Sequence, residues 1–305
     1  MIPIKIGLID VDGHNYPNLA LMKLSAWHKA QGDTVEWYFG MEQYDRVYMS
    51  KVFDDSYSPP HLEPCNTKEL IKGGTGYGLD NALPEEVERM YPDYSLYPEL
   101  TKDTAYGFLT RGCPNACGFC IVSEKEGRVS RKVADLSDWW DGQKNIVLMD
   151  PNILACKGHA ALFEQLIDSG AIVDFNQGLD ARLLTISDVM QLRRMKIKEI
   201  HFAWDLMKNS RFIIKGLNLW KRFGKKNRHG SWGTVYVLVN FNTSMAENLY
   251  RIEKCREMGF DPYVMVYDKP HAPQEIKDLQ RWCNNKIIFK SCKWQDYKPR
   301  KEGAT

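Results

Sequence analysis

Three cysteines lie close together in the segment Phe108-Leu-Thr-Arg-Gly-Cys113-Pro-Asn-Ala-Cys117-Gly-Phe-Cys120. Thiolates on one loop at this spacing bind zinc or an iron–sulfur cluster. A structural zinc site requires four protein ligands, whereas a cubane cluster can use three and leave one iron open. The next possible ligands, Cys156 and His159, follow only after a whole strand–helix unit. The segment therefore favours a 4Fe–4S cluster, with zinc as the alternative.

Regular alternation of strands and helices surrounds this segment from Ala105 onward. The apolar runs predict six strands, at Tyr106–Thr110, Asn145–Met149, Ile172–Phe175, Glu199–Ala203, Thr234–Val239 and Pro262–Tyr267. The helices between them have capping boxes at Thr185-x-x-Asp188 and Ser244-x-x-Glu247, and Gly170 and Gly259 at their expected ends. This order predicts a parallel sheet, curled or open, whose active site lies at the carboxyl ends of the strands. Those ends carry Arg111, Asp150, Gln177, Asp205, Asn240 and Asp268.

The pattern Cys-x-x-x-Cys-x-aromatic-Cys directly after the first of these strands resembles the radical S-adenosylmethionine (SAM) superfamily over residues 105–270. The resemblance implies a partial (β/α)6 barrel in which Cys113, Cys117 and Cys120 hold a 4Fe–4S cluster. The methionine amino and carboxylate groups of SAM would chelate the open iron. One-electron reduction, by a protein such as a flavodoxin or ferredoxin, would give methionine and a 5′-deoxyadenosyl radical that abstracts hydrogen from the substrate.

The same resemblance implies contacts to SAM from later strand ends. Asp150 stands where the superfamily places a glycine-rich acidic segment that contacts the methionine amino group, although the glycines are absent here. Asp205 would bind the ribose hydroxyls, and Arg182 offers a guanidinium for the methionine carboxylate. The cofactor-binding residues expected in this way are Phe119 beside the adenine, Asp150, Gln177, Asp180, Arg182, Asp205 and Asn240 near the adenine. The alternative is that Asp150 and Asp205 cap the helices that follow them.

Residues 1–80 form a separate, acidic region. Expected strands at Ile4–Asp10, Thr34–Tyr38, Arg46–Val52 and before Gly74, with a helix over Pro17–Lys29, predict a small, shortened doubly wound α/β unit. It resembles the cobalamin-binding domain that precedes the barrel in one radical SAM subgroup. Asp12-Gly-His14 approaches the cobalt-ligating loop of such domains but departs from it at Pro17. The resemblance therefore implies a degenerate domain that has lost the corrin, with cobalamin binding as the alternative.

The remaining segments are a tyrosine-rich acidic linker at residues 81–104 and a C-terminal extension at 271–305, with a frayed tail from Lys293. Residues 1–100 carry 8 basic and 16 acidic side chains, and residues 101–305 carry 33 and 23. The most basic stretch, 193–228, includes Trp220 and Phe223, which suits either nucleic acid or a solvated helix face. Cys255 is expected in the core, and Cys283 and Cys292 could help to hold a second cluster.

Several classes of protein are disfavoured by composition. The chain has 305 residues, 44% hydrophobic and 26% charged, which indicates a globular protein. No apolar run approaches the ~20 residues of a membrane span, and the first residues do not resemble a secretory signal, so we expect a cytoplasmic protein. The sequence predicts a radical SAM enzyme acting on an unidentified small molecule, peptide or nucleic acid. The alternatives are a cobalamin-dependent radical SAM methyltransferase and a non-enzymatic zinc- or nucleic-acid-binding protein.

Overall fold

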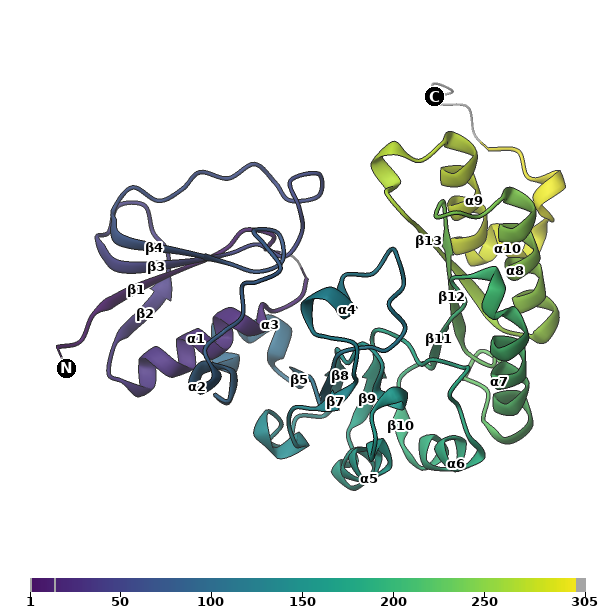
Figure 1. Cartoon of the computed structure of the whole chain (residues 1–305), viewed down its shortest axis with the longest axis horizontal. Helices are drawn as coiled ribbons and strands as arrows, with labels where there is room; N and C mark the ends of the chain where they lie inside the picture. Colours follow the sequence, from purple (N-terminus) through teal and green to yellow (C-terminus); the bar gives the residue numbers. More distant parts are fainter. Residues whose placement is uncertain (1, 14, 300–305) are drawn as a thin grey trace.

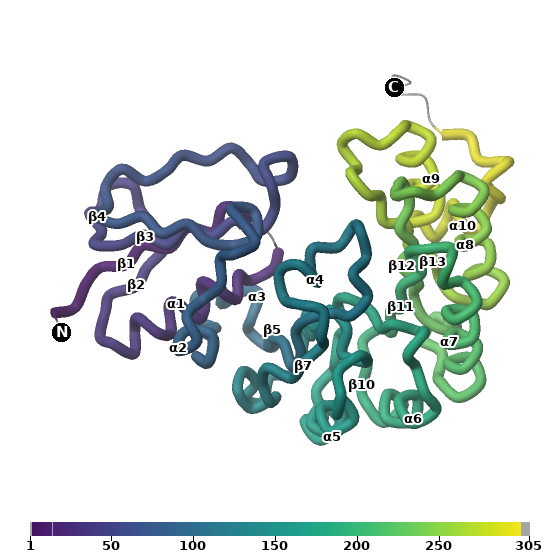
Figure 2. The backbone as a smooth tube through the Cα atoms, viewed as in Figure 1, coloured from purple at the N-terminus to yellow at the C-terminus, as the bar shows by residue number. Residues whose placement is uncertain are grey.

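The computed structural model describes residues 2–13 and 15–299 as a mixed α/β protein with parallel sheets (Figure 1). The purple N-terminal unit and the yellow C-terminal helices lie at opposite ends of the chain trace (Figure 2). Residue 14 is outside the described residues, and so is the expectation that His14 ligates cobalt. No helix in the described ranges is long and apolar enough to cross a membrane.

The N-terminal unit is a four-stranded parallel sheet with the order β2-β1-β3-β4. Its elements are β1 (Lys5–Asp10), α1 (Leu19–Ala30), β2 (Thr34–Trp37), β3 (Tyr44–Ser50) and β4 (Thr67–Gly73). The four predicted strands and the predicted helix are present. The parallel order β2-β1-β3-β4 is that of a doubly wound sheet, as predicted. Of the described residues before Glu85 only α1 is α-helical, so the unit lacks the other crossover helices. Residues 38–43 are too few for a crossover helix, and Pro59 and Pro60 interrupt the long connection before β4.

Residues 81–104, expected as a linker, contain short helices that pack against the N-terminal unit. They contain α2 (Glu85–Glu88), the 3-10 helix η1 (Tyr94–Leu96) and α3 (Pro98–Thr101), and the apolar side chains of the first two join the core under α1. The Tyr97 hydroxyl donates to Asp10 at 2.7 Å, on β1. The Tyr94 hydroxyl donates to the carbonyl of Trp139 at 2.5 Å, in the following region. This segment therefore fastens the N-terminal unit to the remainder of the chain.

Residues 104–266 supply all six strands predicted after Ala105, each followed by helix or loop. The elements are β5 (Thr104–Gly107), β6 (Thr110–Arg111), α4 (Val122–Lys125), β7 (Arg131–Lys132), η2 (Leu136–Asp138), β8 (Asn145–Leu148), η3 (Ile153–Ala155), α5 (His159–Ser169), β9 (Ile172–Phe175), α6 (Ile186–Arg194), β10 (Lys196–Ile197), β11 (His201–Ala203), η4 (Met207–Asn209), α7 (Ser210–Phe223), β12 (Thr234–Val239), α8 (Met245–Met258) and β13 (Asp261–Val266). Two of these strands, β9 and β12, have the predicted bounds.

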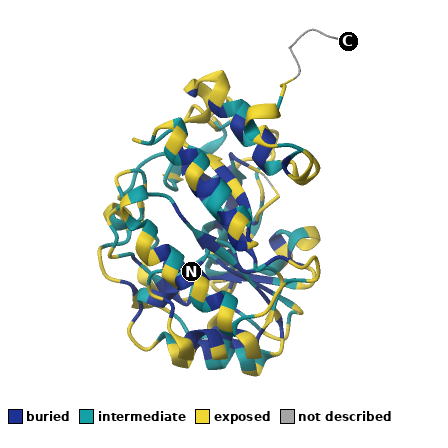
Figure 3. Cartoon of the chain, turned by 90° about the vertical axis from the view of Figure 1, so that its right-hand side faces the viewer, coloured by how far each residue is buried: buried dark blue, intermediate teal, exposed yellow. Residues whose placement is uncertain are grey.

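Apart from β6 and β7, which pair with each other, these strands form two parallel sheets, with the orders β10-β9-β8-β5 and β11-β12-β13. An isolated parallel bridge between Leu179 and Phe202 joins them. The structure thus supports a parallel α/β fold for this region, whereas a single curled sheet of a partial (β/α)6 barrel remains a prediction. Both predicted capping boxes are present, and Gly170 and Gly259 end their helices in the left-handed conformation. The helices are buried along one side and exposed along the other (Figure 3).

The C-terminal extension packs against the second sheet. It consists of η5 (Lys269–His271), α9 (Gln274–Asn284), α10 (Lys286–Ser291) and η6 (Trp294–Asp296). Trp282 of α9 is fully buried, and the ring of Trp294 lies edge-on to it at 5.6 Å. The sequence predicts a frayed tail from Lys293. This prediction is wrong for Trp294, whose ring packs against Trp282.

Other expectations concern the basic stretch and the remaining cysteines. Trp220 is 1% exposed, and its indole N–H donates to the carbonyl of Trp232, so it cannot stack on a nucleic-acid base. The basic face of α7 is thus better explained as a solvated helix surface. Cys255 is fully buried, which confirms it as a core residue. Cys283 is buried too, and its thiol donates to the carbonyl of Pro262.

A partly buried ion pair between α5 and α6 gives a testable pH dependence. His159 Nε2 lies 2.8 Å from Asp188, whose bond raises the pKa of His159 above its ordinary 6.5. Burial opposes ionisation of Asp188, but the bonds from His159 and Thr185 lower its pKa below 3.8. The contribution of His159 to the free energy of unfolding is therefore fully present below pH 6.5. It is lost as pH rises through the raised pKa of His159 in the folded protein. The aspartate contribution is lost as pH falls below 3.8.

We expect His159→Phe to lower the free energy of unfolding by about 1–2 kcal/mol near pH 5.5, and by clearly less near pH 8.5. Urea denaturation of both proteins at the two pH values measures this difference. The exposed pair of His271 and Asp268 provides the control, since His271→Phe should change stability little at either pH. An equal loss for His159→Phe at both pH values would show that the pair contributes by packing alone.

Candidate functional site

The three cysteines lie on a hairpin beyond the carboxyl end of β5. Strands β6 and β7 pair antiparallel at its base, and α4 lies within it (Figure 1). The backbone N–H of Cys113 donates to the carbonyl of Gly127 at 3.1 Å, and that of Cys120 to Cys117 at 2.9 Å. Gly112 has φ +88, and a Cβ there would lie 2.2 Å from the carbonyl of Val129. Glycine is therefore required directly before Cys113.

Acidic side chains anchor the base of this hairpin. Glu126 accepts from the backbone N–H of Gly112 at 3.1 Å and from the guanidinium of Arg111 at 2.9 Å. Asp150, at the end of β8, accepts from the backbone N–H of Leu109 at 3.0 Å and from both the N–H and hydroxyl of Thr110 at 2.6 Å. These bonds fix the direction in which the chain leaves β5.

Asp150 is 5% exposed, and burial raises its pKa to about 6 although its hydrogen bonds oppose the shift. Both of its carboxylate oxygens already accept bonds from Leu109 and Thr110. Its side chain also does not cap the 3-10 helix that follows β8, whose N-cap position is Asn152. The structure therefore gives Asp150 a role in shaping the cysteine hairpin and rules out the helix-cap alternative, while its contact with SAM stays a prediction.

Asp180 lies at the centre of a polar network beside the cysteines. Arg182 donates to its two oxygens at 2.7 and 2.6 Å, as a fork. Asn115, from the cysteine hairpin, donates at 3.1 Å, and Asn152, from the end of β8, at 3.3 Å. Burial opposes ionisation of Asp180, but these bonds hold its pKa below the ordinary value. The network joins the ends of β8 and β9 to the segment that carries Cys113 and Cys117.

Asp205 reaches the same region from the end of β11. Burial raises its pKa to about 6, against the opposing effect of Arg251. Burial also raises the pKa of the Cys117 thiol, and the nearby Asp205 carboxyl adds to that shift. Arg251 of α8 is fully buried and donates to the carbonyls of Trp204 and Asp205 at 2.8 and 2.7 Å. It therefore holds the end of β11 in place.

An aromatic cluster packs against Phe119 of the hairpin. The ring of Phe119 lies edge-on to Phe241 at 5.4 Å, and Phe241 lies edge-on to Tyr267 at 4.9 Å. Asn240 has φ +65, and its side-chain amide donates to the carbonyl of Tyr267 at 2.9 Å. Asn240 thus supports the loop after β12, while Gln177 lies on an exposed turn after β9.

The structure brings most of the expected site residues to one region, the cysteine hairpin together with Asp180, Arg182 and Asp205. Sequence reasoning missed Asn115, Asn152 and Arg251. Asn152 had a usable signal, because it follows Asp150 at a strand end by two residues. Arg251 had none, since its bonds cross 46 and 47 residues of sequence from the middle of a helix.

The residues of this region fit a three-cysteine cluster with SAM in their chemical kind. Three thiols lie on one loop at the strand ends, with Cys120 exposed and the other two half-buried. Asn152 is 4% exposed, and its Oδ1 has no hydrogen-bond partner in residues 2–13 and 15–299, so it is an unused acceptor beside Cys113. In the described part of the chain, however, no three Cys, His, Asp or Glu side chains are arranged as a metal site. The cluster is thus not shown.

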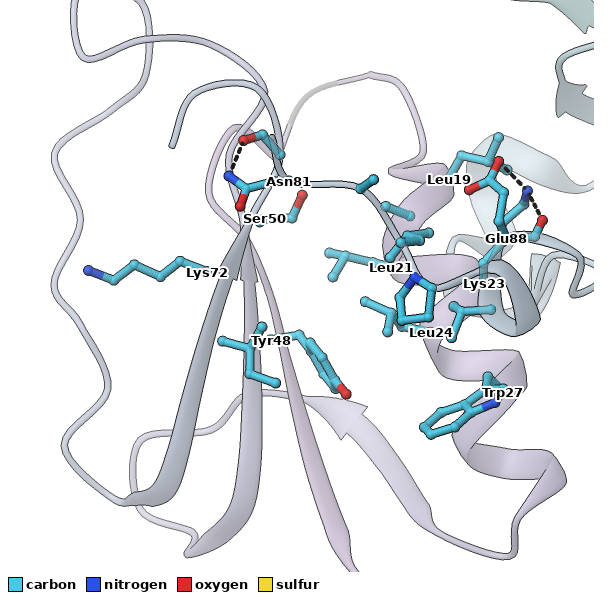
Figure 4. A pocket seen from close by; sticks show the side chains of 18 of the residues that line it. Leu19, Leu21, Lys23, Leu24, Trp27, Tyr48, Ser50, Lys72, Asn81 and Glu88 are labelled. Atoms are coloured by element: carbon cyan, nitrogen blue, oxygen red, sulfur yellow. Dashed lines mark hydrogen bonds and ion pairs between the residues drawn. The ribbon is translucent and has the colours of Figure 1, made fainter. Parts of the chain in front are cut away.

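A separate cavity of about 700 Å³ lies between α1 and the N-terminal sheet. Leu21, Leu24 and Trp27 of α1 face Tyr48 of β3 across it (Figure 4). Arg111 and Lys125 of the cysteine hairpin contribute to its lining on the other side. Glu86, Val87 and Glu88 of α2 also line it, so α1 and α2 together bound the cavity on the helix side.

Comparison with known proteins establishes no family. No protein-family model matches the chain, and no curated protein matches its sequence. Among solved structures, it is similar to the cobalamin-dependent S-adenosylmethionine radical enzyme OxsB, whose structure contains aqua-cobalamin and S-adenosylmethionine. The identity is 13% and the TM-score is 0.42, over 87% of this chain and 49% of OxsB. The chain thus spans about half the length of that enzyme, and a likeness this low carries no functional conclusion.

Proposed function

We propose that the protein is a radical SAM enzyme in which Cys113, Cys117 and Cys120 hold a 4Fe–4S cluster. The observation that supports this most is the placement of the three thiols on one hairpin at the strand ends, beside the Asp180 network and Asp205. A bound cluster would supply the electron that cleaves SAM to methionine and a 5′-deoxyadenosyl radical.

The chain's own residues would bind and orient SAM around the hairpin. Asp205 supplies an acceptor for the ribose hydroxyls, and Phe119 supplies an apolar ring beside the adenine. Nε and one terminal nitrogen of Arg182 already donate to Asp180. Arg182 would therefore bind the methionine carboxylate through its other terminal nitrogen. Asn152 Oδ1 offers a free acceptor for the methionine ammonium group. Cys120 is exposed, which leaves this edge accessible to a reducing protein such as a flavodoxin or ferredoxin.

The proposal includes a partial barrel for residues 105–270, a cytoplasmic protein and an unidentified substrate from which hydrogen is abstracted. The substrate could be a small molecule, a peptide or a nucleic acid. The burial of Trp220 removes one of the features that favoured nucleic acid.

Anaerobic reconstitution with iron and sulfide, followed by reduction in the presence of SAM, tests the proposal. We expect about four irons per chain, a brown protein and formation of 5′-deoxyadenosine. One tightly bound zinc per chain, with no iron cluster after reconstitution, would contradict the proposal and favour a structural zinc clip. A cluster that never cleaves SAM under any reductant would contradict the enzymatic part.

A further inference from the structure

The side chain of Asn152 contacts the cysteine hairpin directly. Its Nδ2 lies 3.6 Å from Sγ of Cys113, a length suited to a sulfur acceptor because sulfur is larger than oxygen. The same Nδ2 donates to Asp180 at 3.3 Å. Asn152 is 4% exposed, so water competes little for either bond.

The orientation of this amide is determined by its neighbours. Turning it over would point Oδ1 at the Asp180 carboxylate, which can only accept, and at the Cys113 sulfur, which only accepts when it is a thiolate. Asp180 is itself fixed by the fork from Arg182. An N–H donor therefore faces the sulfur of Cys113, and the backbone carbonyl of Asn152 accepts from the hydroxyl of Ser130 at 2.9 Å, which holds the residue in position.

Hydrogen bonds to cysteine sulfur change the electronic properties of an iron–sulfur cluster. Reduction adds one electron, and part of the added negative charge resides on the sulfur ligands. An N–H donor stabilises the reduced form more than the oxidised form, because the interaction grows with the charge on the acceptor. The stabilisation of the reduced form by such a hydrogen bond is stronger in a buried site than in water.

We propose that Asn152 is a positioning residue that raises the reduction potential of the cluster through its N–H bond to Cys113. This inference rests on the proposed function, because it requires a cluster on the three cysteines. A higher potential would make the cluster easier for the electron donor to reduce.

Anaerobic redox titration of the reconstituted protein, followed by the electron paramagnetic resonance signal of the reduced cluster, tests this role. Asn152→Leu removes the donor and keeps a similar volume, and Asn152→Ala removes both the donor and the bulk; neither adds charge. We expect both variants to retain wild-type iron content and to show lower midpoint potentials. Asn145→Asp, at the opposite end of β8, is the matched control and should leave the potential unchanged.

The possible failures are distinguishable. Variants with a wild-type iron content and an unchanged midpoint potential would overturn the role of Asn152 and leave the proposed function standing. Loss of the cluster from both variants would show that Asn152 retains the cluster, not that it tunes it, and would also overturn the inference. A wild-type protein that takes up no cluster would contradict the proposed function itself.

Discussion

Single replacement of Cys113, Cys117 or Cys120 by alanine is expected to abolish formation of 5′-deoxyadenosine. Each variant removes one of three ligands from a site that has no fourth cysteine or histidine in its hairpin. We expect at least a 100-fold loss of SAM cleavage and a large fall in iron per chain, because losing a ligand should cost more than the 10–100-fold typical of outer-shell changes. Iron analysis and quantification of 5′-deoxyadenosine after anaerobic reconstitution measure both effects.

Cys65→Ala is the matched control for these variants. Cys65 is exposed, like Cys120, but lies in the N-terminal unit outside the hairpin. It should keep both the iron content and the SAM cleavage of the wild type. If the hairpin variants and Cys65→Ala behave alike, the cysteines of the hairpin do not form the cluster site.

Arg251→Met is expected to lower the free energy of unfolding by about 3–5 kcal/mol. The guanidinium is fully buried and donates to the carbonyls of Trp204 and Asp205 and, at 2.6 Å, to Oδ1 of Asn248. Methionine fills a similar volume but leaves these buried acceptors without a donor, which is costly. Urea denaturation of the purified protein measures the change.

Two comparison variants separate the hydrogen bonds of Arg251 from its charge and bulk. Arg251→Lys keeps the charge but cannot form the same fork, so we expect an intermediate loss. Arg211→Met, on the exposed face of α7, should change stability by no more than about 0.5 kcal/mol. A loss for Arg251→Met as small as that of Arg211→Met would show that the end of β11 does not depend on this residue.

The Arg251 variant also links stability to the site. The residue holds the backbone at Trp204 and Asp205, and the Asp205 carboxyl lies in the electrostatic field of Cys117 and Arg182. Loss of Arg251 should therefore disturb the strand end that carries Asp205 even under conditions in which the protein stays folded.

The sequence by itself determined the local features of this protein. The apolar runs located β9 and β12 with their bounds, and the capping boxes at Thr185 and Ser244 were predicted correctly. The spacing of the three cysteines and their position after a strand were also evident from the sequence. Such features depend on residues within a few positions of one another, because strand runs, caps and loop ligands are all local interactions.

Only the tertiary structure decided what the polar residues at the strand ends do. The sequence placed Asp150 near SAM or at a helix cap, but its carboxylate binds Leu109 and Thr110, about 40 residues earlier in the chain. The sequence offered Arg182 as a partner for the methionine carboxylate, and the structure adds that Asp180 engages it within a network that also includes Asn115 and Asn152. A carboxylate or amide binds whichever donor the fold brings within about 3 Å, and that partner leaves no periodic signal in the sequence.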